Sequence, residues 1–304
     1  MRSPLDSFPY GSAADTYYQL YLPNDDKPHG YMLPEIVQKM PWIPNFHIQH
    51  SHPRKVTVLD SSHGKDTAGA INAAFSEVVT TCVEQNLFHV LDGKHSEPFA
   101  VVGARYDHPV YVERFATALF GLTTRGAHLV AYRMDQDGMK VWVPRRSAHL
   151  YTYPNMLDTT VAGGVKSGVP PFQTIVEEAD EEASLPEGLI RQKARCRGVI
   201  SHMNVTGDDF PGEKGLVTPD YVYVYDIELP EDITPKPHDE EVSSFTLMRV
   251  EELQAALLRE EFKPDSAAVL VDFLIRHGII TPENEPDFVE ISMRLHRRLP
   301  FRTG

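Results

Sequence analysis

The segment from Ala162 to Leu185, AGGVKSGVPPFQTIVEEADEEASL, constrains the fold of this chain more than any other. From Phe172 onward its residues repeat at the helical spacing of about 100° per residue, which separates apolar from charged side chains. The apolar face consists of Phe172, Ile175, Val176, Ala179 and Ala183. The opposite face consists of Glu177, Glu178, Glu181 and Glu182, with Asp180 at its border. The sequence therefore predicts a helix that packs one face into a core and presents a stripe of carboxylates on the other.

The carboxylate stripe suggests a cation site. Like charges three and four residues apart destabilise a helix by a few tenths of a kcal/mol per pair, roughly, so four together make sense if a cation sits among them. Hard divalent ions such as Mg²⁺ take oxygen ligands and usually hold phosphate as well. A solvated acidic face is the alternative interpretation. The glycines that lead into the helix, Gly163, Gly164 and Gly168, favour the cation site over a solvated face.

The same segment resembles the Nudix box, G-x5-E-x7-R-E-U-x-E-E-x-G-U, in which U is aliphatic. The matching residues are Gly163, Glu178, Ala179, Glu181, Glu182 and Leu185. The residues that depart from the pattern are Val169 for the first Glu, Glu177 for the Arg and Ser184 for the last Gly. In the family that Glu and Arg pair with each other, so both partners of one salt bridge are replaced together here. The resemblance implies that Glu178, Glu181 and Glu182 are metal ligands and catalytic residues.

Further segments are similar to one branch of the superfamily, whose fungal and plant members carry an extra N-terminal domain and include fusions to thiamine pyrophosphokinase. They are WVPRRS at 142–147, YPNMLDTTVAGGVKSG at 153–168, EEADEEASLP at 177–186, YDIELPED at 225–232, DEEVSSF at 239–245 and FKPDSAAVLVDFLIRHGIITP at 262–282. Asn155 and Leu150 stand where the branch tends to have Gly and Lys. The resemblance implies an α/β class fold: an α/β/α sandwich with a mixed sheet over 121–304, and a smaller N-terminal α+β domain over 1–120.

The chemistry implied is metal-assisted attack of water on a diphosphate, with Mg²⁺ or Mn²⁺ as cofactor. Gly163 and Gly164 are expected to form a loop whose backbone N–H groups approach the anion. Arg145 and Arg146 are adjacent, so in a strand one of them would face a phosphate and the other solvent, unless both are ordinary surface arginines. Glu241, from the acidic loop before the strand at Val242, is expected to contribute a further catalytic carboxylate. The resemblance points to thiamine diphosphate, and more readily its oxidised forms, as substrate.

Two alternative functions stay open, and a third is disfavoured. A substrate linked to a nucleoside diphosphate, or a weakly active Nudix-like binding module, would share these features. An isopentenyl-diphosphate isomerase relative would need a catalytic Cys, and Cys82 and Cys196 lie outside the box. A cluster of histidines at His47, His50 and His52 fits no standard metal-ligand spacing, so a surface loop is expected there.

Composition excludes several classes of partner. A net charge of −14 over 304 residues argues against surfaces for nucleic acid or for an anionic membrane. Two cysteines make a disulfide framework improbable on number alone. The chain has no apolar run of membrane-spanning length and no apolar secretory segment near residue 1. We therefore expect a cytoplasmic protein, with a nuclear pool left open, that acts on a small molecule as a monomer or homodimer.

Periodicity and turn residues predict the other elements. Expected strands are Lys55–Leu59, His128–Tyr132, Met139–Pro144, Arg197–Ile200, Asp220–Leu229 and Val242–Met248. Expected helices are Tyr31–Met40, Thr67–Glu84, Phe115–Phe120, one starting at Val250, Ser266–His277 and Pro286–Leu299. Asp137-Gly138 should close a hairpin between two of the strands. Residues 1–30 are expected to be irregular.

Overall fold

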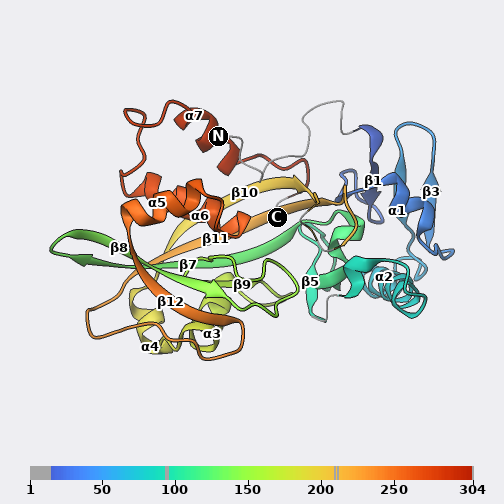
Figure 1. Ribbon diagram of the computed structural model, residues 1–304. Coiled ribbons are helices and arrows are strands. Elements are labelled where there is room, and N and C mark those ends of the chain that lie inside the picture. The colour runs from blue at the N-terminus through green and yellow to red at the C-terminus, as the bar shows by residue number, and fades with distance from the viewer. Residues whose placement is uncertain (1–14, 93–95, 209, 211, 303–304) are drawn as a thin grey trace.

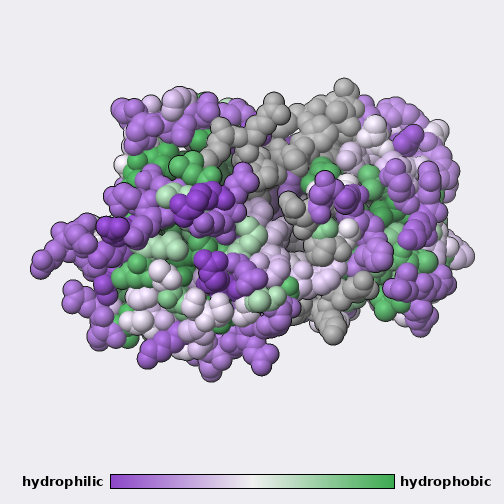
Figure 2. Space-filling model, viewed as in Figure 1, coloured by the Kyte–Doolittle hydropathy of each residue, from purple (hydrophilic) through white to green (hydrophobic). Residues whose placement is uncertain are grey.

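The computed structural model describes residues 15–92, 96–208, 210 and 212–302. Two strand-containing regions lie next to each other, with the larger sheet on the left and the N-terminal region on the right of Figure 1. On the face shown in Figure 2, hydrophilic residues dominate the periphery and hydrophobic residues form smaller patches. Within the described residues, no helix has both the length and the apolar character needed to cross a membrane.

A six-stranded mixed sheet forms the larger region, with the order β10-β11-β7-β8-β12 and with β9 paired to β7. β7 runs parallel to β11, whereas the other neighbouring strands are antiparallel. The strands are β7 (Thr124–Asp135), β8 (Gly138–Arg146), β9 (Val161–Gly164), β10 (Arg195–Val205), β11 (Val217–Glu228) and β12 (Val242–Arg249). The expected strands of this region are confirmed, although β9 was not foreseen.

β7 is the central strand of this sheet and is longer than the strand predicted there. Its second half pairs with β8, and Asp135 faces Gly138 at the predicted hairpin turn. Gly138 has a φ of 114°, which favours glycine at that turn. The first half of β7 pairs with β9 on one side and with β11 on the other. These pairings extend the strand well before His128, its expected start.

Helices cover both faces of the sheet, which confirms the sandwich (Figure 1). The helices below it in that view are α3 (Pro171–Ala183) and α4 (Glu187–Lys193), and those above it are α5 (Val250–Leu258) and α6 (Pro264–Arg276). Ile175 and Ala179 of α3 join one fully buried apolar cluster, and Val269 and Phe273 of α6 join another. α7 (Phe288–Leu295) lies beside β10 and is shorter than the helix predicted there.

The N-terminal region contains a four-stranded sheet with the order β2-β1-β4-β3. Its elements are β1 (Tyr18–Tyr21), β2 (Gly30–Met32), α1 (Pro34–Lys39), β3 (Phe46–Gln49), β4 (Lys55–Val58), α2 (Thr67–Glu84), and the 3-10 helices η3 (His89–Asp92) and η4 (Arg114–Phe120). α2 matches its predicted bounds, and Phe75 of α2 packs edge-on against Phe120 with ring centroids 5.0 Å apart.

Three expectations for this region were wrong in part. The stretch before residue 30 is only partly irregular where it is described, because it contains β1, in which Leu20 pairs with Gly30 of β2 and with Val56 of β4. Pairing of Gly30–Met32 as β2 also delays the start of α1, so the predicted helix from Tyr31 is shorter. Residues 1–14 lie outside the described residues. The histidine-rich segment contributes β3 rather than a loop alone.

The two regions are joined by a small hairpin and by the C-terminal segment. The hairpin consists of β5 (Pro98–Ala100) and β6 (Tyr111–Glu113), and Figure 1 shows β5 near β9. At the C-terminal end, Phe301 packs against Tyr31 with ring centroids 5.5 Å apart. Arg302 donates a hydrogen bond of 2.8 Å to Asp25. These contacts hold the N-terminal region beside the larger sheet and bring it close to the glycine segment.

Candidate active site

α3 carries the acidic residues and is fixed at both ends. Pro171 at its first position is suited to a helix start because its missing N–H would be unpaired there in any case. Ser184 ends the helix in a left-handed conformation with φ 52°, and its N–H donates to the carbonyl of Asp180 at 3.1 Å. Glycine is the usual residue for this cap, so Ser184 accepts some backbone strain.

Glu182 is buried, with 6% of its surface exposed, and this corrects its expected place on the helix face opposite the core. Its Oε2 accepts a hydrogen bond of 3.0 Å from the backbone N–H of Ala162 in β9. Burial and then the neighbouring charge of Glu178 raise the pKa of Glu182 well above its ordinary value. The helical wheel contains the signal: Glu182 follows Ile175 by two turns, so it lies on the side of α3 that packs against β9.

Glu178 lies one turn before Glu182 and is partly buried. A Cβ atom placed on Gly163 would be 2.3 Å from its Oε1, so only a glycine in β9 permits this approach. The pKa of Glu178 is raised to about 7, first by burial and then by the charges of Glu181 and Glu241. Two carboxylates thus share a region that is withdrawn from water, and burying such charges is unfavourable unless a cation offsets them.

The other two glutamates of α3 face outward. Glu177 and Glu181 are exposed, and Glu177 accepts a hydrogen bond of 2.8 Å from Gln173 on the same helix. In the part of the chain that the structure describes, no three His, Cys, Asp or Glu side chains already converge as a metal site. The donors nevertheless fit a hard divalent cation, since Glu178 and Glu182 offer carboxylate oxygens side by side where negative charge is poorly solvated.

The acidic loop before β12 packs against the C-terminal end of α3. Within it, Lys236 N–H donates to the carbonyl of Ala183 at 3.0 Å, and Asp239 N–H donates to the carbonyl of Glu181 at 3.1 Å. The two bonds use carbonyls that the helix end leaves without partners. They also bring Glu241 close enough for its charge to raise the pKa of Glu178 and of Glu182. The predicted proximity of this loop to the helix is therefore present in the structure.

Arg145 and Arg146 lie at the end of β8, where both guanidinium groups hold the segment that leads to β9. Arg146 forms a salt bridge of 3.0 Å with Asp158 and donates to the carbonyls of Thr152 and Tyr153. Arg145 is exposed and donates to the carbonyl of Asn155 at 2.7 Å. The two side chains therefore have structural partners, and their predicted contact with substrate stays a prediction.

Gly163 and Gly164 are strand residues rather than members of a loop, which corrects the expectation. They pair with Ala127 and Gly126 of β7. Their small size is needed for side-chain packing: a Cβ on Gly164 would lie 2.7 Å from Cζ of Phe99. The positive φ expected of a glycine loop occurs later, at Gly168 with φ 80°.

Comparison with known proteins now adds to this geometry. Residues 123–273 match the NUDIX domain, and this range contains the sheet, α3 and the acidic loop. This part of the chain is a Nudix domain.

Sequence similarity to related proteins covers more residues than the Nudix domain alone. The chain is 45% identical over 200 residues to the uncharacterized protein YJR142W of Saccharomyces cerevisiae, covering 64% of this chain and 58% of that protein. It is 34% identical over 213 residues to Nudix hydrolase 20, chloroplastic, of Arabidopsis thaliana. That similarity covers 69% of this chain and 54% of the plant protein. It is 36% identical over 186 residues to Nudix hydrolase 24, chloroplastic, of the same plant. That similarity covers 60% of this chain and 48% of the plant protein. The chain therefore spans about half the length of the curated relatives it matches.

Among solved structures, the crystal structure of DR0079 from Deinococcus radiodurans is 21% identical and superposes with a TM-score of 0.40. The similarity covers 66% of this chain and 100% of that one.

Sequence reasoning missed two basic residues near the Nudix carboxylates. Arg114, at the start of η4, and Lys166, just after β9, both lie close enough to Glu178 to oppose the rise in its pKa that burial causes. Arg114 belongs to the N-terminal region, and no motif of the Nudix domain points to it. Lys166 lies inside the resemblance, but its spacing from Glu178 gave no sign of proximity.

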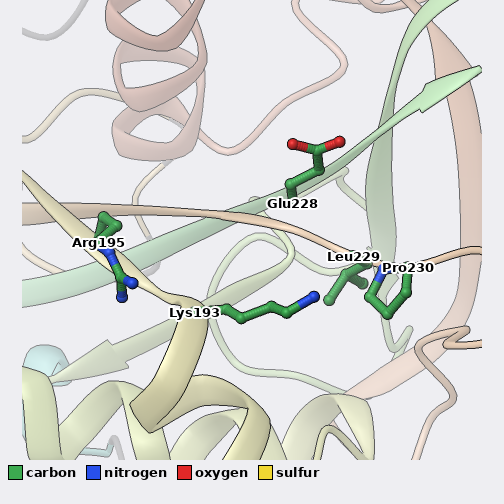
Figure 3. A pocket seen from close by; sticks show the side chains of 5 residues that line it. All are labelled: Lys193, Arg195, Glu228, Leu229 and Pro230. Carbon is green, nitrogen blue, oxygen red and sulfur yellow. The ribbon is translucent and has the colours of Figure 1, made fainter.

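A cavity of about 380 Å³ lies elsewhere on the Nudix domain. Its lining residues are Lys193, Arg195, Glu228, Leu229 and Pro230, and in Figure 3 the Lys193 side chain extends toward Leu229 and Pro230. None of the site residues predicted from the sequence lines it. The carboxylates of α3 and their neighbours remain the candidate active site, because chemistry rather than cavity size distinguishes them.

Proposed function

We propose that this protein is a Nudix-type hydrolase that uses Mg²⁺ or Mn²⁺ to cleave a diphosphate linkage. The observation that carries the proposal is the pairing of Glu178 and Glu182 beneath β9, where both are partly or fully withdrawn from water. Carboxylates arranged in this way attract a divalent cation, which also binds phosphate oxygens. Glu181 is exposed one turn from Glu178 and is proposed as a further ligand.

When bound, the metal ion would neutralise phosphate charge and lower the pKa of water. The backbone N–H of Ala162 holds Glu182 in one orientation, so one oxygen remains free to act as a ligand. Glu241 is proposed to accept a proton from the attacking water, as a general base must lie within reach of the proton it removes. Water adds across the P–O–P bond, and one phosphate leaves as an inorganic anion.

For the substrate, we propose thiamine diphosphate, and more readily its oxo and oxy derivatives, with the monophosphate and phosphate as products. The segments shared with the thiamine-associated branch support this choice, among them 153–168 and 262–282. An oxidised thiazole ring has lost its positive charge, so preference for it must come from shape or hydrogen bonds rather than from aromatic faces that hold cations. A substrate linked to a nucleoside diphosphate is the competing possibility.

The test is to measure kcat/KM under one Mg²⁺ condition for thiamine diphosphate, its oxo and oxy forms, ADP-ribose and nucleoside diphosphates. We expect the oxidised thiamine compounds to give the highest value. If kcat/KM for a nucleotide substrate is higher by about tenfold or more, equivalent to about 1.4 kcal/mol of transition-state binding, the thiamine assignment fails. Only the assignment as a diphosphate hydrolase then stands. Binding without turnover of any substrate would instead indicate a Nudix-like binding module.

We further propose that the protein acts in the cytoplasm as a monomer or homodimer. The absence of a membrane-length apolar run in the sequence and its acidic composition support this proposal. A fluorescent fusion and light scattering at several protein concentrations test the two points. A plastid location would overturn the first, and a larger oligomer the second.

A further inference from the structure

Glu97 joins the N-terminal region to the Nudix domain through two cations. Its Oε2 lies 3.1 Å from Nη1 of Arg114, and its Oε1 lies 3.0 Å from Nζ of Lys166. Glu97 and Arg114 flank the β5–β6 hairpin, whereas Lys166 follows β9 and leads toward α3. One carboxylate therefore fixes a basic side chain from each region at the same place.

The same hairpin packs directly on the segment between β9 and α3. The carbonyl of Pro98 accepts a hydrogen bond of 2.7 Å from the N–H of Ser167. Phe99 of the hairpin and the adjacent Arg114 also pack against Gly164. A Cβ atom on Gly164 would lie 2.7 Å from Phe99 and 3.3 Å from Arg114. A contact this close leaves room only for glycine.

These contacts take the place of an interaction that the Nudix box of this chain lacks. Val169 and Glu177 occupy the two positions that would otherwise form a salt bridge within the box. In their absence, Lys166 and Ser167 are held from outside the domain by Glu97 and Pro98. The N-terminal region thus positions the segment that begins the acidic helix.

The two cations are also placed to meet an anion. The side chains of Arg114 and Lys166 are 43% and 46% exposed. Each has more N–H donors than the one that pairs with Glu97. Their charges act on Glu178, and that of Lys166 acts on Glu181 as well. Both cations therefore lie beside the carboxylates of the candidate active site, with N–H donors that Glu97 does not use.

We propose that Arg114 and Lys166 bind phosphate oxygens of the substrate, so that the N-terminal region completes the active site of the Nudix domain. The inference rests on the proposed function, because the anion is the diphosphate that function requires. Glu97 is a positioning residue, which holds both cations in place before substrate arrives. Arginine suits this role because its planar fork of donors matches phosphate oxygens.

The experiment measures binding of methylenediphosphonate, a diphosphate analogue that cannot be hydrolysed, by calorimetry at fixed Mg²⁺. The variants are Arg114→Ala, Arg114→Lys and Glu97→Gln, with Arg259→Ala as control. Arg259 is an exposed arginine that is likewise paired with one glutamate, Glu261, but lies at the end of α5. Mn²⁺ affinity without the analogue, followed by electron paramagnetic resonance, and the melting temperature are measured on each protein.

Charge-assisted hydrogen bonds of this kind predict that Arg114→Ala weakens analogue binding about 10- to 100-fold. Arg114→Lys should recover part of that loss, and Mn²⁺ affinity should stay within about twofold of the wild type because the metal ligands are untouched. In steady-state assays of diphosphate hydrolysis, Glu97→Gln should raise KM more than it lowers kcat, since the cations remain but are less well placed. Arg259→Ala should match the wild type in every measurement.

Two results would overturn the inference alone. One is analogue binding by Arg114→Ala equal to that of Arg259→Ala, and the other is a parallel loss of Mn²⁺ affinity and melting temperature, which would make Arg114 a structural residue. A wild-type protein that binds the analogue through Arg114 but hydrolyses no diphosphate would support the anion site and defeat the proposed hydrolase. A wild-type protein that does not bind the analogue at all would defeat both.

Discussion

The carboxylate of Glu182 accepts a hydrogen bond of 3.0 Å from the backbone N–H of Ala162, which links helix α3 to strand β9 across twenty residues of chain. A hydrogen bond to a buried carboxylate stabilises its charged form and fixes its orientation. The bond therefore distinguishes Glu182 from the exposed glutamates of the same helix, and the first prediction uses that difference.

Replacing Glu182 with Gln is expected to lower hydrolysis by about two or more orders of magnitude, the effect of removing a key electrostatic group. Glu177→Gln is the matched control, because it removes the same charge from an exposed position of α3. Its activity should stay within about threefold of the wild type. Both proteins should fold, since each change relieves repulsion within the helix. Full activity in Glu182→Gln would exclude this glutamate from the site.

Gly163→Ala is expected to displace Glu178, because the added methyl group would lie 2.3 Å from its Oε1. Activity should fall about as far as in Glu178→Gln, and the double variant should lose little more, since both changes act on one group. Gly188→Ala, in α4, is the control because a Cβ there meets nothing within 4 Å. That change should leave activity intact and slightly stabilise the protein, because alanine favours a helix more than glycine does. Additive losses in the double variant would argue against the displacement.

Glu241→Gln and Glu240→Gln form a second matched pair in neighbouring positions. Glu241 is partly buried and its charge acts on Glu178 and Glu182, whereas Glu240 is exposed. If Glu241 is the general base, its loss should lower kcat by about 10²- to 10⁴-fold and remove the acidic limb of the pH–rate profile. Glu240→Gln should behave as the wild type. Equal profiles for both variants would leave the base to be sought elsewhere.

Asp220 predicts a dependence of stability on pH that is separate from catalysis. It is partly buried in β11, and this burial together with the charge of Asp265 raises its pKa from 3.8 to about 7. A carboxyl group whose pKa is higher in the folded state opposes folding once it ionises. Its contribution is therefore most favourable below pH ~4 and is lost as the pH rises through about 7.

Asp220→Asn should consequently raise the free energy of unfolding at pH 8 by up to about 4 kcal/mol, and the gain should vanish near pH 4. Urea denaturation at several pH values measures the difference. Asp232→Asn, at an exposed position after β11, provides the control and should show no such trend. A pH-independent difference between Asp220→Asn and the wild type would show that packing rather than ionisation is responsible.

Local pattern was enough to predict most helices and strands. The bounds of α2 followed from apolar residues at helical spacing, and the turn at Asp137-Gly138 followed from residue types that favour a tight hairpin. The short strands β1, β2 and β9 could not be foreseen in the same way. Each is only three or four residues long and exists because a distant strand offers backbone partners.

For the site, the sequence alone identified the acidic helix and the loop that carries Glu241, because both are continuous stretches whose residue types and spacing match a known chemistry. Only the tertiary structure decided what encloses two of these carboxylates: β9 covers the side of α3 that carries Glu182 and Glu178. It also decided that Arg114 stands beside them. Burial and electrostatic proximity depend on which elements pack together, and a contact between residues more than sixty positions apart leaves no mark in the local pattern of either.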